Sequence, residues 1–242
     1  MIIDLLKKSI PEYSAFLPDQ NNSFTYRPLL VKEEKYISII TTIKSSFEEK
    51  MNNLCLLVDS CFENKIKSQN LTVNDFQIAL NLIRQKSISE ISEFKMTCPF
   101  TSEEVNINVN LNSFIQDKTE KKLKILINDI FVFVFEKPKV SSLIKLNNFP
   151  STEEDWFNLI SDCLVEINTE KEKINFESLS VEEKIKYIEF IDKDSFQNIK
   201  KFIKLNTISF KIDYNLSDGT KKEIEVNDFV NFLKFFLVIL TL

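Results

Sequence analysis

The chain has 242 residues, of which 43% are hydrophobic, and a formal net charge of −5. It contains no histidine and a single glycine, Gly219. These absences exclude glycine-rich phosphate-binding loops and remove the commonest general base and metal ligand, and no basic stripe stands out that would bind nucleic acid.

The N-terminal third is predicted to form a β-hairpin followed by three helices. Residues 12–17 and 23–31 read as strands around the turn-former cluster DQNN, and a helix is expected to start near Lys32. A second apolar stripe predicts a helix over 46–63. Thr72 and Asp75 resemble a capping box that opens a third helix, which ends near residue 86.

The middle of the chain is predicted to be β-structure. Residues 88–114 contain two alternating apolar and polar runs on either side of PFTSEE, which predicts a hairpin. Residues 121–138 are rich in β-branched and aromatic side chains and predict two short strands around Asn128 and Asp129.

From Phe149 the pattern is mainly helical. Capping boxes are predicted at Ser151–Glu154 and at Ser180–Glu183, and a further helix over about 194–204. Residues 207–232 repeat the order of the first hairpin, with a strong turn signal at Asp218-Gly219. We therefore predict an α+β fold with two helix-then-hairpin units, divided into an N-terminal α+β part (1–148) and a mainly helical part (149–242).

The two termini and the cysteines indicate no special chemistry. The apolar run of MIIDLLKKSI is too short for a signal peptide. The apolar run after Lys234 has eight residues, against the roughly 20 that a membrane helix needs, so we expect no stable membrane insertion. Three interpretations of this C-terminal run stay open: a buried terminal helix or strand, a segment that docks on a partner, and membrane contact. The four cysteines form no C-x-x-C pair, so we expect free, buried thiols, no metal and no cofactor.

No constellation of residues predicts catalysis. Adjacent carboxylates such as Glu33-Glu34, Glu103-Glu104 and Glu153-Glu154 point in different directions in a strand or helix, and helix-start and surface positions explain them. Cys163 lies at a helical core position without a base to activate it.

The two arginines, Arg27 and Arg84, are unusual in a chain with 29 lysines. A guanidinium offers a rigid fork that binds a carboxylate through two hydrogen bonds, which lysine does not. Candidate partners are Glu33, Glu34 and Glu90. The alternative is that both arginines are ordinary surface charges.

The order of motifs resembles one family. A strand containing Leu17-Pro18 precedes YRPLLVKEEK, a helix ends in LIRQKSISE before a hairpin, and LSVEEKIKYIEFIDKDSFQNIKKFI precedes the second hairpin and DFVNFLKFF. This is similar to the T-even-type bacteriophage baseplate hub assembly proteins over most of the chain, with 115–175 the weakest part. The positions that match the family motif are Arg27, Pro28, Glu33, Glu34, Lys35, Arg84, Lys86, Ser87 and Glu90. Two features depart from it, namely Ser89 where glycine is expected and the apolar tail after Phe236.

The resemblance implies a non-enzymatic protein that helps to build the phage tail. Its partners would be other baseplate hub proteins, in the host cytoplasm during assembly and, in one version, in the virion. Three hypotheses follow: a transient, chaperone-like hub assembly factor, a permanent structural subunit of the hub or tail tip, and a cell-wall-cleaving hub enzyme, which the composition disfavours.

Overall fold

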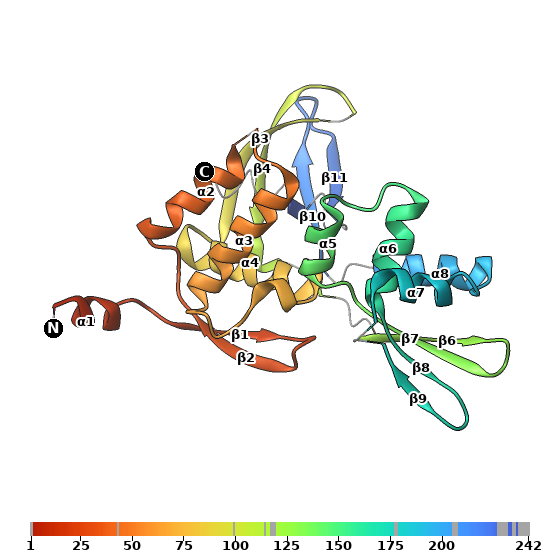
Figure 1. Cartoon of the computed structure of the whole chain (residues 1–242). Helices are drawn as coiled ribbons and strands as arrows, with labels where there is room; N and C mark the ends of the chain where they lie inside the picture. Colours follow the sequence, from red (N-terminus) through yellow and green to blue (C-terminus); the bar gives the residue numbers. More distant parts are fainter. Residues whose placement is uncertain are drawn as a thin grey trace.

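Helices pack against several small sheets, which confirms the predicted α+β class (Figure 1). The computed structural model describes residues 2–42, 44–98, 100–113, 115–116, 120–176, 179–204, 208–226, 232–233 and 236. Buried apolar side chains from both halves of the chain form one hydrophobic cluster.

The predicted N-terminal hairpin is present, but its second strand is shorter than expected. The first elements are α1 (Ile2–Lys8), β1 (Tyr13–Leu17), β2 (Asn22–Tyr26), the 3-10 turn η1 (Val31–Glu33) and α2 (Glu34–Thr41). The strand β2 ends at Tyr26 rather than at residue 31. Its ladder cannot continue because the Arg27 N–H donates to Cys61 O at 3.0 Å and Pro28 has no N–H.

Two long helices form the centre of the N-terminal part, as predicted. They are α3 (Phe47–Cys61) and α4 (Val73–Ser87), joined by the 3-10 turn η2 (Ser68–Asn70). Thr72 Oγ1 caps α4 by accepting the Asp75 N–H at 3.2 Å. The Asp75 carboxylate does not complete the predicted capping box, because it accepts the N–H groups of Asp19 and Gln20 in the β1–β2 turn. This carboxylate therefore fastens the hairpin turn to the start of α4.

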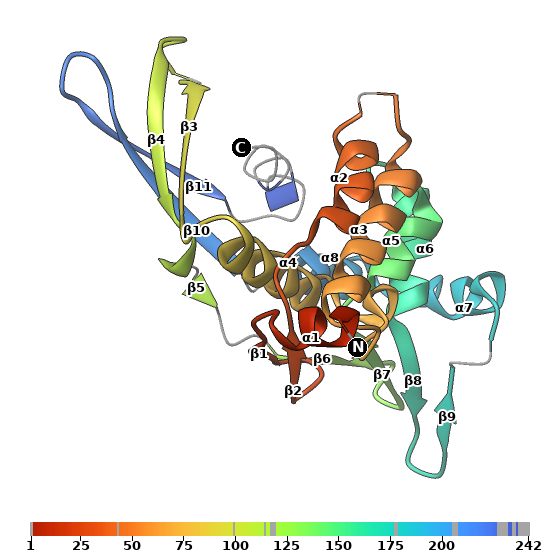
Figure 2. The ribbon, with the colours of Figure 1, turned by 90° about the vertical axis from the view of Figure 1, so that its left-hand side faces the viewer.

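Both predicted helix-then-hairpin units are confirmed, and their hairpins lie side by side (Figures 1 and 2). The elements after α4 are β3 (Ile91–Thr97), β4 (Glu104–Asn110), the 3-10 turn η3 (Leu111–Ser113) and β5 (Ile115–Gln116), and those after α8 (Lys193–Lys204) are β10 (Ile208–Asn215) and β11 (Lys221–Val226). The strand β10 pairs with both β11 and β5. The hairpins are joined by Cys98 Sγ and Tyr214 Oη, 3.3 Å apart, and by the Ser217 N–H, which donates to Glu103 Oε1.

A four-stranded antiparallel sheet connects the middle of the chain to the C-terminal part. Its strands, in spatial order, are β6 (Lys122–Ile127), β7 (Phe131–Glu136), β8 (Leu164–Asn168) and β9 (Lys173–Asn175). The two strands predicted around Asn128 and Asp129 are present, and the turn residues have φ values of 50° and 56°, which a tight hairpin turn favours. The sequence analysis assigned neither β8 nor β9. The division at residue 148 stays a prediction, and this sheet pairs strands from either side of it.

The helices that follow β7 include one that was not predicted. They are α5 (Val140–Leu146), α6 (Glu153–Cys163), α7 (Val181–Ile188) and α8, and the first of these was missed. The capping box Ser180–Glu183 is confirmed. The other box begins one residue later than predicted, at Thr152 with Asp155. Near the C-terminus Phe232, Leu233 and Phe236 are buried, and the rest of the apolar run after Lys234 lies outside the described residues.

Candidate functional site

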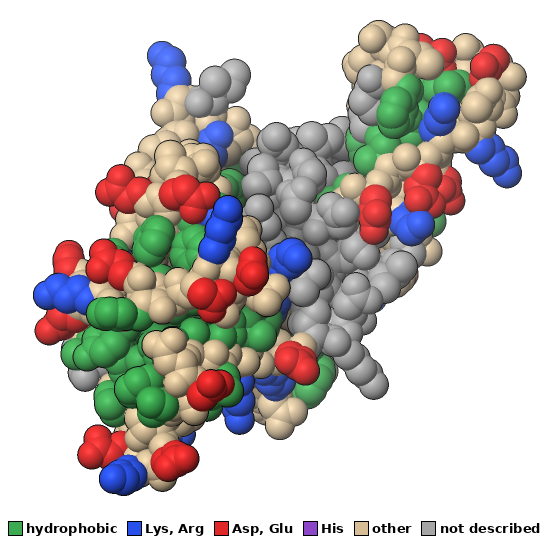
Figure 3. All heavy atoms as spheres, turned by 90° about the vertical axis from the view of Figure 1, so that its right-hand side faces the viewer, with side chains coloured by type: hydrophobic (Ala, Val, Ile, Leu, Met, Phe, Trp, Pro, Cys, Tyr) green, Lys and Arg blue, Asp and Glu red, His purple; other side chains and the backbone are tan. Residues whose placement is uncertain are grey.

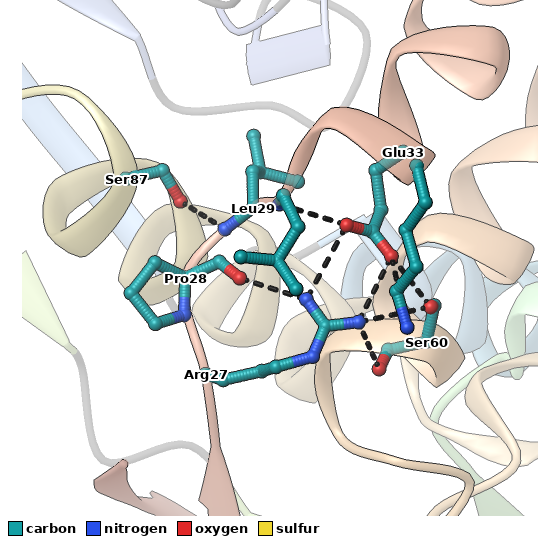
Figure 4. A network of polar contacts seen from close by, with 8 residues as sticks. Arg27, Pro28, Leu29, Glu33, Ser60 and Ser87 are labelled. Carbon is teal, nitrogen blue, oxygen red and sulfur yellow. Dashed lines mark hydrogen bonds and ion pairs between the residues drawn. The ribbon is translucent and has the colours of Figure 1, made fainter. Parts of the chain in front are cut away.

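The motif RPLLVKEEK forms a corner between β2 and α2, and Arg27 is at its centre (Figure 4). The Arg27 side chain is buried against the C-terminal end of α3. Its Nη2 donates to Glu33 Oε1 at 2.9 Å, and its Nη1 lies 3.3 Å from Glu33 Oε2. The predicted two-point pairing of Arg27 with a carboxylate is therefore confirmed, and the carboxylate is Glu33.

The same guanidinium ties together three chain segments. Nη1 donates to Pro28 O at 2.8 Å, and Nη2 donates to Ser60 O at 3.0 Å. Ser60 Oγ in turn donates to Glu33 Oε1 at 2.7 Å. The fork geometry of arginine makes these bonds possible together, which a single ammonium does not.

Glu33 is fully buried, and its pKa reflects the network around it. Burial by itself raises the pKa of Glu33. Hydrogen bonds from Arg27, Ser60 and the Leu30 N–H, together with the charge of Arg27, outweigh burial and hold the pKa below its usual value. The carboxylate is therefore charged at neutral pH and holds the turn η1 in place.

The second motif, R-x-K-S-x-x-E at the end of α4, is joined to the first by one side chain. Ser87 Oγ accepts the Leu29 N–H at 2.8 Å (Figure 4). The structure thus brings Arg27, Pro28, Glu33 and Ser87 of the predicted set into one site. Serine at this position satisfies a backbone N–H that Pro28 and the end of β2 leave without a ladder partner.

Arg84 is buried as well, but its described hydrogen bonds differ from the predicted carboxylate pairing. It donates to Ser89 O at 3.1 Å and to Ser92 Oγ at 2.9 Å, and burial lowers its pKa. Glu90 was predicted as an arginine partner. It is exposed and instead accepts from Lys86 Nζ at 2.7 Å and from Asn112 Nδ2 at 2.9 Å. Ser89 has no positive φ, so the turn after α4 does not require glycine.

The remaining motif residues face solvent. Glu34 is exposed, and Lys35 Nζ lies 4.8 Å from the centre of the neighbouring Tyr36 ring. The Lys86–Glu90 pair is of the exposed type that contributes little to stability. The motif segments therefore combine buried hydrogen-bonded side chains, such as Arg27 and Glu33, with side chains such as Glu34 and Lys35 that face solvent.

The family model for the T4 bacteriophage base plate protein matches residues 10–234. The chain belongs to this family. Every residue of the two motifs lies within the matched region. No curated protein and no solved structure matches the chain.

Two further residues of this base plate protein were not singled out for the site by the sequence. Ser60 bridges Arg27 and Glu33, and nothing in its local pattern signals that role. Asp75 is fully buried. Burial raises its pKa to about 6; the charge of Asp19 adds to the increase, and the N–H groups that it accepts oppose it. Its place three residues after Thr72, in a capping pattern, was the only signal.

The cysteines are free and buried, as predicted. Hydrogen bonds from Thr101 and Tyr214 outweigh burial at Cys98 and lower the pKa of its thiol to about 7. Among the described residues, no group of three or more histidines, cysteines or carboxylates is placed to hold a metal ion. Nor does any helix in that part of the chain combine the length and apolar character needed to cross a bilayer.

Proposed function

We propose that this base plate protein is a non-enzymatic, chaperone-like assembly factor of the baseplate hub. It acts through protein–protein contacts in the host cytoplasm while the tail is built. The match to the base plate family over residues 10–234 carries the proposal. The motif corner and two apolar surfaces support it.

The first surface lies beside the buried arginine network. Val31 is 86% exposed on the turn that Glu33 holds, and Ile88 and Ile91 are about half exposed just after α4. The bond from the Leu29 N–H to Ser87 Oγ joins the segments that carry them. Two buried arginine sites thus stiffen a corner that presents aliphatic side chains to solvent, an arrangement suited to a preformed protein contact.

The second surface lies on the opposite part of the molecule. Figure 3 shows apolar side chains gathering over α7 and the outer ends of the sheet β6–β9. The large exposed apolar residues of these elements and their turns are Leu126, Ile130, Phe131, Ile174, Tyr187 and Phe190. An apolar gathering of this kind is typical of a surface that another protein covers.

The alternative is a permanent structural subunit of the hub or tail tip, for which the same surfaces would serve. The two roles differ in whether the protein remains in the particle. We expect mass spectrometry of purified virions to find far less of this chain than of any hub subunit, and phage without the gene to lack completed hubs. The chain at hub stoichiometry in the virion would refute the transient role and support the structural one. A cell-wall-digestion assay tests the non-enzymatic part of the proposal, with no digestion expected.

A further inference from the structure

Among the described side chains of the N-terminal helix α1, three are large, aliphatic and exposed. Ile2, Leu5 and Leu6 are 73%, 64% and 62% exposed. Figures 1 and 2 show α1 projecting from the rest of the molecule on the chain that leads to β1. Ser9 closes the helix, since its N–H lies 3.1 Å from Leu5 O and its Oγ donates to Leu6 O at 2.7 Å.

The three side chains follow the spacing of a packed helix face. Positions 2, 5 and 6 are i, i+3 and i+4, which lie on one side of a helix. The helix α8 uses the same i, i+3 spacing for Phe196, Ile199 and Phe202, and there all three side chains are buried. A seven-residue helix is too short to be stable in water by itself, so this face fits a surface that covers it.

The charges around the helix indicate the character of that surface. Lys8 is exposed at the C-terminal end of α1, Lys7 precedes it in the sequence, and Asp4 is the helix's one acidic residue. With two lysines and one aspartate in its sequence, the helix carries a net positive charge, which is complementary to a groove with an acidic rim. The family match begins at residue 10, so α1 lies outside the matched region.

We propose that α1 is a docking helix that inserts Ile2, Leu5 and Leu6 into an acidic-rimmed apolar groove on another protein of the same baseplate. This is the helix-in-groove mode of recognition, with anchors at i, i+3 and i+4. The proposal rests on the proposed function, since it assumes a baseplate partner.

Each baseplate protein of the same phage, produced and purified singly, serves as a probe against the immobilised full chain in a biosensor. We expect Leu5→Asp/Leu6→Asp to weaken binding of one of them by about 30-fold or more, as for central anchors. We expect Lys8→Glu to weaken it by about threefold, with an effect that shrinks as salt is added. The control is Phe16→Asp, which introduces a single aspartate at an exposed apolar position of β1 and should leave binding unchanged.

The outcomes separate the two proposals. Undiminished binding by Leu5→Asp/Leu6→Asp overturns the docking helix and leaves the proposed function intact. Binding of the full chain to none of the purified proteins overturns both. A third outcome is that the unaltered chain binds no baseplate protein but self-associates in light scattering, and that Leu5→Asp/Leu6→Asp abolishes this self-association. The helix would then bind a second copy of this chain, which also overturns the docking helix. Leu5→Ala/Leu6→Ala repeats the measurement without an introduced charge.

Discussion

The substitution Arg27→Lys tests whether the fork geometry of the guanidinium, and not its charge alone, stabilises the motif corner. Arg27 donates to Pro28 O, to both carboxylate oxygens of Glu33, and to the carbonyl and hydroxyl oxygens of Ser60. Lysine keeps the positive charge beside Glu33 but brings one ammonium group on a flexible stem. It cannot reach acceptors on both sides of the corner at once.

The magnitude follows from the bonds that lysine cannot replace. A lysine that pairs with Glu33 leaves Pro28 O without its donor, whereas Ser60 O keeps the Glu63 N–H at 3.2 Å, and the loss of one such bond costs about 1–3 kcal/mol. Because the charge of Glu33 stays compensated, the larger loss of roughly 3–5 kcal/mol that follows removal of one partner of a buried pair is avoided. We therefore expect Arg27→Lys to lower the free energy of unfolding by about 1–3 kcal/mol, and Arg27→Met by about 3–5 kcal/mol.

Urea unfolding at pH 7, followed by circular dichroism, measures both variants against Lys35→Met. This control removes a cation from the same segment but from an exposed position. A midpoint for Arg27→Lys equal to that of the unaltered protein, with an unchanged slope, would refute the argument from geometry. If Arg27→Lys and Arg27→Met lower the free energy of unfolding by the same amount, lysine compensates the charge of Glu33 no better than an uncharged side chain does.

Three further predictions concern stability. Folding lowers the pKa of Glu33. The stability that the unaltered protein gains over Glu33→Gln should therefore be complete above the unfolded pKa near 4.5 and should be lost as the pH falls through the lower folded pKa. Melting curves between pH 3 and 7 measure this difference. The pKa of Asp75 is raised to about 6, so the pH dependence has the opposite sign. Relative to Asp75→Asn, the free energy of unfolding of the unaltered protein should increase by roughly 1–3 kcal/mol as the pH falls from 7 to 4. A stability difference between the two proteins that does not change with pH would contradict the raised pKa. Gly219 has a φ of +84° with no atom within 4 Å of an added Cβ, so Gly219→Ala should cost about 1 kcal/mol from backbone strain alone. Full stability in that variant would show that the turn changes its conformation.

Turns and helix starts could be predicted from the sequence because their signals are local. Asn128-Asp129 and Asp218-Gly219 supply residues that tolerate positive φ, and both hairpins form around them. Ser180 and Glu183 complete a capping box within four residues. Thr152 and Ser151 are equivalent in such a pattern, so only the structure decided that Thr152 with Asp155 caps α6.

Long-range strand pairing explains why the sequence analysis missed β8. The strand β8 starts directly after α6, with no turn residue between Cys163 and Leu164, and its burial does not alternate. It becomes a strand because β7 offers an edge to it and β9 follows. The pairing partner lies about 30 residues away in the sequence, where no local pattern records it.

At the motif corner, the sequence by itself indicated a carboxylate partner for Arg27, with Glu33 as one of three candidates and an ordinary surface charge as the alternative. The reason is chemical, since a rare arginine before a proline and an acidic helix start is explained by two-point pairing. Only the tertiary structure decided the rest: Ser60 and Ser87 complete the network from other helices, and Glu90 pairs with Lys86. Residue type fixes what a side chain can bind, whereas packing of distant segments fixes which groups come within reach.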